Sequence, residues 1–333
     1  MIDTGTTQSL RYTVVEGWEQ LPAGFMHLDC VGVNVDAQDN VYLLTRDQSR
    51  VIVYDRSGKF LRSWGEDLLT PRTHGLTIGP DGTVFVVDEG VNCVYRFNQQ
   101  GEQIGTIGTP GGPSDTGYDG TLESIRGGPP FNRPTNLAVA PNGDLYITDG
   151  YGNCKVHRFS ADGKLIQSWG EPGTGPGQFN LVHGAAVTAD GRVLIADREN
   201  DRIQIFTADG KFIEQWTHVQ RPTNVRIDAA GRIYVSELWW RDGQVSQRNG
   251  VMSPERPGSV CVLAPDGTLL TRFGASTTER SAAGNFVAPH DICVDSHGDI
   301  YVAEVTETFG VRPGLVAPGT HTFQKFKRET DTV

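Results

Sequence analysis

The feature that most constrains the fold of this chain is an internal repeat. Six segments align on a strand of the form G-x-[VIL]-[YFL]-[VIL], and they begin at Val31, His74, Thr135, His183, Thr223 and His290. Turn sequences such as "PDG", "PNG" and "ADG" separate alternating apolar runs within each segment, which favours short antiparallel strands. A repeat of about 35 to 45 residues with up to four strands is typical of one blade of a β-propeller. The sequence therefore predicts an all-β, six-bladed β-propeller, with four-stranded antiparallel blades around a central channel.

The ends of the chain suggest how this ring would close. The sixth segment lacks a fourth strand after "FQKFKR", and the N-terminal "LRYTVVEGWEQLP" resembles the last strand of other segments, as in "KFIEQWTHVQRP". We expect a strand at about residues 10–18 to complete the last blade, which leaves few free sheet edges. We expect one domain over residues 1–333. Two long inserts, at about 109–134 and 239–257, should form loops over one face.

Composition excludes several classes of partner. The formal net charge of −11 argues against nucleic acid or an anionic membrane, because both need clustered Lys and Arg. No apolar run approaches the roughly 20 residues of a membrane span. The N-terminal "MIDTGTTQSLRYTVV" has no basic stretch followed by an apolar one, so we expect no signal peptide. The 5 cysteines never occur with C-x-x-C spacing, which indicates reduced core thiols in a cytoplasmic protein.

Histidine occupies the first position of the second, fourth and sixth segments, as His74, His183 and His290. Alternate blades of a six-bladed ring lie about 120° apart, and the first strand of each blade is nearest the channel. The three imidazoles should therefore meet on the axis, as in a three-histidine metal site with an open coordination position. Zn²⁺ is the expected ion, although imidazole also binds Fe, Mn and Co. Taken alone, each histidine is better interpreted as a satisfied polar residue; their shared position on alternate blades favours the metal.

A second set of candidates follows the second strand of each segment. Arg46 and Arg198 share this position in the first and fourth segments, whose blades should face each other across the channel. Two guanidiniums above a metal would bind a small carboxylate or stabilise a developing anion; the alternative is that Arg198 only pairs with acidic neighbours in "DRENDR". Tyr151, in the tight turn "TDGYGNC", is placed to act as a general base. The alternative for Tyr151 is an aromatic residue at the channel rim.

The segments resemble NHL repeats over nearly the whole chain, a propeller family with many activities. The motifs "TDGYGNCKVHRFSADGKLIQSWGEPGTGPGQFNLVH", "ADRENDRIQIF", "THGL" and "APHDI" further resemble the catalytic core of peptidyl-α-hydroxyglycine α-amidating lyase. This resemblance extends from about residue 30 to 305. It implies a zinc-dependent lyase that cleaves the C–N bond of an α-hydroxyglycine or similar carbinolamide to an amide and glyoxylate, or a related aldehyde. The substrate would be a small molecule with a carboxylate and an α-hydroxyl group.

Carried over residue by residue, the resemblance assigns roles to individual positions. It implies zinc ligands and catalytic residues at His74, His183, His290, Tyr151, Arg198 and Arg46. It also implies a structural Ca²⁺ lower in the channel, held by the Asp291 carboxylate and by the backbone carbonyl groups of Val33 and Leu76. Oxygen ligands suit calcium and imidazoles suit zinc, so His290 would face one ion and Asp291 the other.

The chain also departs from that family's pattern. Secreted members carry a disulfide beside the catalytic tyrosine, where this chain has Gly152 and Asn132, in agreement with a reduced compartment. The insert at 239–257 is unfamiliar, and its Trp239, Trp240 and Arg241 are expected to reshape the pocket. Two other interpretations stay open: a non-enzymatic NHL propeller that binds a protein partner, and a metal-dependent hydrolase that acts on another small substrate.

Overall fold

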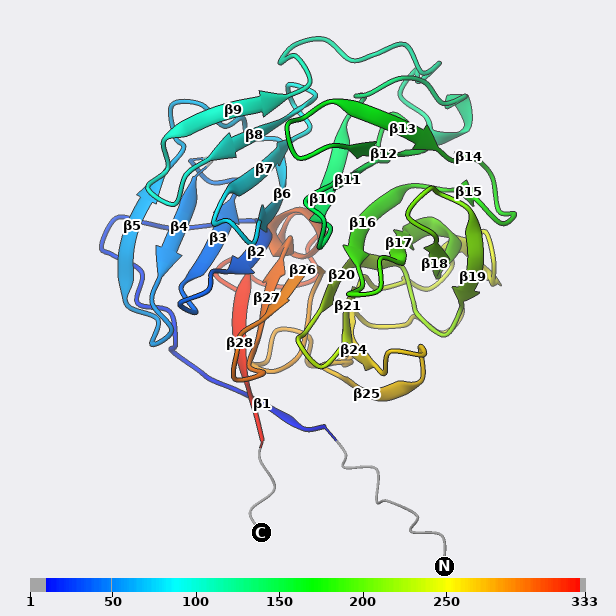
Figure 1. Ribbon diagram of the computed structural model, residues 1–333. Coiled ribbons are helices and arrows are strands. Elements are labelled where there is room, and N and C mark those ends of the chain that lie inside the picture. Colours follow the sequence, from blue (N-terminus) through cyan, green and yellow to red (C-terminus); the bar gives the residue numbers. More distant parts are fainter. Residues whose placement is uncertain (1–9, 49, 330–333) are drawn as a thin grey trace, which may run out of the picture.

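The computed structural model describes residues 10–48 and 50–329 and shows six four-stranded antiparallel sheets arranged around one axis (Figure 1). The prediction of an all-β, six-bladed propeller is confirmed. All five cysteines are buried and unpaired. Residues 1–9, part of the stretch from which we expect no signal peptide, lie outside the described residues. Within the described part of the chain, no helix is long and apolar enough to cross a bilayer.

The first three blades follow one another along the chain. Blade 1 contains β2 (Cys30–Val35), β3 (Val41–Thr45), β4 (Val51–Tyr54) and β5 (Phe60–Trp64). Blade 2 contains β6 (Thr73–Ile78), β7 (Val84–Asp88), β8 (Cys93–Phe97) and β9 (Gln103–Ile107). Blade 3 contains β10 (Pro134–Val139), β11 (Leu145–Asp149), β12 (Lys155–Phe159) and β13 (Leu165–Trp169).

The other three blades complete the circle. Blade 4 contains β16 (Val182–Val187), β17 (Val193–Asp197), β18 (Arg202–Phe206) and β19 (Phe212–Trp216). Blade 5 contains β20 (Pro222–Ile227), β21 (Ile233–Glu237), β24 (Ser259–Leu263) and β25 (Leu269–Phe273). Blade 6 contains β26 (Pro289–Val294), β27 (Ile300–Glu304), β28 (Phe323–Arg328) and β1 (Tyr12–Val14).

The loops between strands contain several short secondary-structure elements. Two small ribbons pair β14 (Glu171–Pro172) with β15 (Gln178–Phe179), and β22 (Val245–Ser246) with β23 (Gly250–Val251). Single helical turns are η1 (Leu122–Ser124), η2 (Arg198–Asn200) and η3 (Glu307–Val311). Of the two inserts expected to be long loops, one thus carries η1 and the other carries the β22–β23 ribbon.

The ring is held by apolar contacts between neighbouring blades. The first strands contact one another in the order β2, β6, β10, β16, β20, β26 and back to β2. Every residue of the second strands is buried, because both faces of each blade pack against a neighbour. Phe85 of β7, for example, belongs to the same apolar cluster as Leu137 and Ile147 of blade 3. Outer strands such as β19 are partly exposed, which fits their more polar sequences.

The N-terminal strand supplies the outer strand of the last blade. β1 pairs antiparallel with β28, placing Tyr12 opposite Arg328 (Figure 1). The Tyr12 ring also stacks on Phe273 of blade 5, with ring centroids 5.3 Å apart. The edge of β28 is therefore covered by a strand from the opposite end of the chain, and the ring closes non-covalently.

Trp18 fills the seam between the first and last blades. Its side chain is 8% exposed, and its ring lies 5.6 Å from Tyr54 of blade 1 and 5.2 Å from Tyr301 of blade 6, centroid to centroid. Its indole N–H donates to the carbonyl oxygen of Arg56 at 2.9 Å. One side chain thus joins three aromatic and polar contacts across the closure.

We predict that Trp18→Ala lowers the free energy of unfolding by about 3–5 kcal/mol, because it removes a buried aromatic ring and leaves a cavity at the closure. Urea denaturation followed by circular dichroism measures the change. Leu61→Ala is the control: Leu61 is 41% exposed, and its loss should cost less than about 0.5 kcal/mol. Equal midpoints for the two variants would show that Trp18 does not hold the closure.

Candidate metal centre in the channel

A β-bulge lies at the first position of every repeat. In β6 the pairing with β7 passes from Thr73 opposite Asp88 to Gly75 opposite Val87, so His74 is the extra residue. The same shift in the other five first strands leaves unpaired Val31, Thr135, His183, Thr223 and His290. A bulge redirects the side chain of its extra residue. The bulge therefore explains how one repeat position sends three histidines to the same place.

The three histidines meet in the channel. Ligand atoms of His74, His183 and His290 all lie within 4.8 Å of one another, and the Nε2 atoms of His74 and His290 are 3.2 Å apart. The ring planes of each pair are steeply inclined, at 64° to 77°. All three side chains are buried, with at most 6% exposed. The structure thus brings together the three predicted ligands.

Each histidine is fixed by a backbone group of the next blade. The Nδ1 atoms of His74, His183 and His290 lie 2.7, 2.6 and 2.8 Å from the carbonyl oxygens of Thr135, Thr223 and Val31. Those three acceptors occupy the same repeat position in the odd-numbered blades. A carbonyl oxygen only accepts, so each Nδ1 carries the hydrogen and each Nε2 presents a lone pair.

This arrangement fits a metal ion. Three Nε2 lone pairs face one point, and the single hydroxyl hydrogen of Tyr151 can satisfy only one of them. Two nitrogens bound at about 2.05 Å to a tetrahedral zinc are about 3.3 Å apart, close to the spacing of His74 and His290. A cation at this point would convert the repulsion between lone pairs into coordination. The three histidines can therefore hold a metal.

Electrostatics keep the imidazoles neutral, the form that binds metals. Burial, reinforced by Arg46 and then Arg198, lowers the pKa of His290 to about 3. Burial and neighbouring positive charge also hold the pKa values of His74 and His183 well below their usual range. The ligands are therefore unprotonated throughout the physiological pH range.

Tyr151 lies directly over the histidines. Its hydroxyl oxygen is 3.1 Å from Nε2 of both His74 and His183. Nη1 of Arg198 donates to the same oxygen at 3.4 Å. The guanidinium carbons of Arg133 and Arg198 lie 5.2 and 5.7 Å from the centre of its ring. The phenol oxygen is thus beside the metal point and flanked by positive charge.

The loop that carries Tyr151 is braced at Gly152 and Asn132, the two positions where the resemblance implies a disulfide in secreted amidating lyases. A Cβ atom at Gly152 would lie 2.1 Å from Oδ1 of Asn132, so any larger residue there would force the Asn132 side chain to move. The Gly152 N–H donates to the Asn132 carbonyl oxygen at 3.1 Å, and Nδ2 of Asn132 donates to Thr116 at 2.9 Å. Close packing and hydrogen bonds therefore hold this loop without a covalent link.

Two carboxylates organise the arginines around the centre. Nε of Arg198 donates to Glu199 at 2.8 Å, so the charged turn does pair with it, while Nη1 reaches Tyr151. Nε of Arg46 donates to the Thr73 carbonyl oxygen at 3.2 Å, and Nη2 lies 3.6 Å from Glu89. Both predicted arginines therefore lie beside the histidines. Each also has guanidinium N–H groups that form no hydrogen bond within the described residues.

Two further arginines were missed by sequence reasoning. Arg133 binds Glu89 through Nη2 at 3.0 Å, and Arg221 binds Glu199 through Nη2 at 2.6 Å. Both belong to the repeated tetrapeptide "RPTN" of the third and fifth segments, and both have positive φ, +58° and +30°. The repeated tetrapeptide is the sequence feature from which these two arginines could have been identified.

The 239–257 insert forms a wall beside these arginines. The guanidinium carbon of Arg221 lies 4.4 Å from the centre of the Trp240 ring, and its Nη1 donates to the Trp239 carbonyl oxygen at 3.1 Å. Nε1 of Trp240 donates to Asp201 at 2.8 Å. Arg241 stacks on Trp239 at 4.2 Å. The insert therefore contacts Arg198 through Arg221 and Glu199, while Trp239 and Trp240 remain buried.

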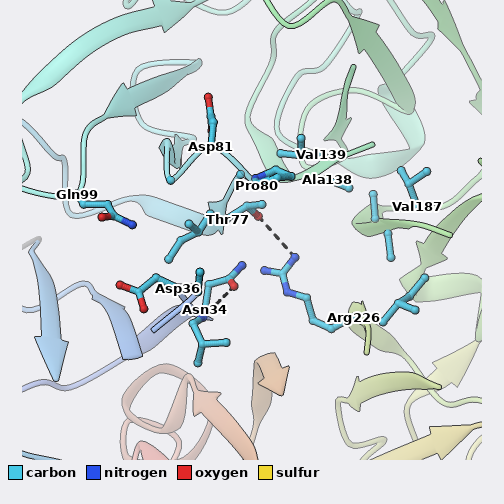
Figure 2. Close-up of a pocket in the computed structure, with 18 of the residues that line it drawn as sticks. Asn34, Asp36, Thr77, Pro80, Asp81, Gln99, Ala138, Val139, Val187 and Arg226 are labelled. Carbon is cyan, nitrogen blue, oxygen red and sulfur yellow. Dashed lines mark hydrogen bonds between the residues drawn. The ribbon is translucent and has the colours of Figure 1, made fainter. Parts of the chain in front are cut away.

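The lower channel contains a positive side chain among the residues implied for calcium. Nη2 of Arg226 donates to the Leu76 carbonyl oxygen at 2.9 Å and to Oδ2 of Asp291 at 3.4 Å. Asp291 also accepts the N–H of Val33 at 3.0 Å. Below lies a hollow of about 610 Å³ at the opposite mouth from the histidines, lined by the ends of the first strands (Figure 2). Leu76 and Asp291 are thus linked by an arginine that sequence reasoning missed, and Val33 reaches Asp291 through its N–H instead of its carbonyl oxygen.

Comparisons with known proteins agree with the fold and the motifs. The NHL repeat model matches residues 131–159 and 179–206. NHL repeat-containing protein 3 of Mus musculus is 30% identical over 293 residues, which cover 83% of this chain and 76% of that protein. Peptidyl-alpha-hydroxyglycine alpha-amidating lyase 1 of Drosophila melanogaster is 26% identical over 281 residues, 78% of this chain and 47% of that protein. The structure of virginiamycin B lyase from Staphylococcus aureus shares the fold, with a TM-score of 0.54, 17% identity and coverage of 89% and 81%.

Fold, repeats and the histidine cluster together define a six-bladed NHL-repeat propeller with a candidate metal centre in its channel. Within that class, the chain belongs to the family of NHL repeat-containing protein 3. The resemblance to amidating lyases is confirmed as well, since the fly lyase is among its relatives.

We predict that His183→Ala abolishes stoichiometric binding of a divalent transition metal, because two imidazoles leave the ion without its third protein ligand. Elemental analysis after gel filtration measures the metal content. His218→Ala, at an exposed position, should retain the wild-type content. Full metal content in His183→Ala would exclude this centre as the binding site.

Proposed function

We propose that this protein is a zinc-dependent lyase that cleaves the C–N bond of a small α-hydroxyglycine-type carbinolamide to an amide and glyoxylate. One observation carries the proposal: three Nε2 lone pairs converge beside the hydroxyl of Tyr151. Imidazole ligands with an open position suit zinc. The identity of a relative as an amidating lyase supports the reaction class.

A zinc ion held by His74, His183 and His290 would act as a Lewis acid toward the substrate hydroxyl group. Tyr151, as phenolate, accepts the proton of that hydroxyl. As the C–O bond becomes a carbonyl, the C–N bond breaks and its electron pair stays on nitrogen. Nitrogen then takes a proton, so an N-acyl-α-hydroxyglycine yields an amide and glyoxylate with all atoms balanced.

The two arginines stabilise different negative charges in this reaction. Arg198 touches the Tyr151 oxygen, so its charge stabilises the phenolate. Arg46 has guanidinium N–H groups with no protein acceptor in the described residues, which suits a substrate carboxylate. Glu89 and Glu199 hold these two arginines in place. The substrate is thus expected to bind through its carboxylate and react through its hydroxyl.

We predict that Tyr151→Phe retains wild-type metal content but loses at least about 100-fold in kcat, because it lacks the group that accepts the proton. The assay is glyoxylate release from α-hydroxyhippurate, with zinc measured in the same samples. Tyr118→Phe is a matched control, since Tyr118 contacts Arg133 but not the histidines.

Two results would count against the proposal in different ways. Near-wild-type turnover of Tyr151→Phe would remove Tyr151 from the mechanism. A wild-type protein that holds zinc but releases no glyoxylate would reject this substrate class while leaving the metal site standing.

We predict that the two arginines affect different kinetic constants. Arg46→Gln should mainly raise KM, because it removes a contact to the carboxylate that exists before and during the reaction. Arg198→Gln should mainly lower kcat, because it removes the positive charge beside Tyr151, which must be a phenolate to accept the substrate proton. Steady-state kinetics on α-hydroxyhippurate separates the two. Identical effects on KM and kcat in both variants would contradict this division.

A second function rests on a separate observation, the match to NHL repeat-containing protein 3, whose name states no activity. A propeller that only binds a partner has no need of converging imidazole lone pairs. Elemental analysis separates the two, because a pure binding scaffold should contain no stoichiometric zinc. A hydrolase acting on another small substrate would keep the zinc but release no glyoxylate.

A further inference from the structure

We propose that the guanidinium of Arg226 takes the place of a structural calcium ion in the lower channel, so that the protein carries its own cation there. The atoms implied for calcium are the Asp291 carboxylate and the Val33 and Leu76 carbonyl oxygens. Two of these three groups already accept hydrogen bonds from Arg226. The proposal does not depend on the lyase activity.

The position of Arg226 lets one side chain span the channel. Arg226 lies in β20 of blade 5, and Leu76 lies in β6 of blade 2, directly across the ring. Its Nη1 also lies 3.5 Å from Oγ1 of Thr77, and Figure 2 shows the side chain reaching over to that residue. Asp291 adds blade 6, so a single guanidinium links three blades, as a central metal ion would.

The remaining valences of Asp291 are filled by protein groups. Oδ1 accepts the N–H of Ile292 at 2.7 Å and the side-chain amide of Asn224. Oδ2 accepts the N–H of Val33 at 3.0 Å in addition to Arg226. Calcium requires six to eight oxygen ligands at about 2.3–2.6 Å. With Arg226 bound to both Oδ2 of Asp291 and the Leu76 carbonyl oxygen, two of the implied ligand groups are occupied by a cation already, so the donor set of the wild type does not fit calcium.

Charge balance favours the arginine as well. Asp291 is the carboxylate that touches Arg226, and its single negative charge is neutralised by the guanidinium. The nearest acidic residues of the hollow, Asp36 and Asp81, use their oxygens to cap their own turns. Adding Ca²⁺ would bring two more positive charges against a neutral pair. The lower channel therefore has a cation already and no spare anion.

The test compares calcium binding in the wild type and in Arg226→Met, an uncharged side chain of similar length. Both proteins are passed over a chelating resin and reloaded with zinc, so that the histidine centre is the same in each. Isothermal titration with calcium chloride, and thermal unfolding with and without millimolar calcium, are then measured. We expect no heat and no shift in Tm for the wild type. Arg226→Met should have a lower Tm that calcium raises by several degrees.

Two further variants keep the test decisive. Arg158→Met breaks a comparable ion pair with Asp144 away from the channel, and it should lose stability without gaining calcium binding. If Arg226→Met fails to fold, the double variant Arg226→Met with Asp291→Asn removes both charges and should recover folding. One tightly held calcium in the wild type would overturn the proposal. A folded Arg226→Met that binds no calcium would also overturn it, because the guanidinium would then not stand at an ion site.

Discussion

The candidate centre depends on a hydrogen bond from each histidine to the backbone of the next blade. A β-bulge turns the side chain of His74 inward, and the Thr135 carbonyl oxygen then fixes its ring and its tautomer. A β-bulge and a hydrogen bond to a backbone carbonyl oxygen orient His183 and His290 in the same way. Because every bond crosses a blade boundary, the ligand geometry is set by the closed ring and not by any one blade. The non-covalent closure at Trp18 therefore supports the site from a distance.

The centre concentrates positive charge in an acidic protein. Four arginines lie around Tyr151 and the histidines although the chain has a net charge of −11. Two carboxylates, the buried Glu89 and the partly buried Glu199, make this possible, because each pairs with two of these arginines. Each carboxylate thereby offsets part of the repulsion between neighbouring guanidinium groups. Both acids are therefore already paired, in agreement with the anionic substrate that we propose.

Periodicity explains which features could be predicted from the sequence. The six-bladed fold and the meeting of the histidines both follow from one repeat position, so aligning the segments was sufficient. Arg226 and Trp240 act through contacts with residues far away in the chain, and no repeat period marks such partners. Asp291 and Leu76 were expected to hold an ion because the resemblance assigned ligand roles to those positions and said nothing about Arg226. Only the coordinates show that a side chain from β20 reaches them.

The two proposals together place two kinds of cation site along the same strands of the channel. Above, three imidazole Nε2 atoms meet and only the single hydroxyl hydrogen of Tyr151 is shared between two of them, an arrangement that favours a bound cation with an open position. Below, Arg226 and Asp291 form an ion pair, and Arg226 also donates to the Leu76 carbonyl oxygen, so this level already contains a cation. A covalently attached cation holds blades 2, 5 and 6 together whatever the supply of metal. In the two proposals, the lower level thus has a structural role and the upper level a catalytic one.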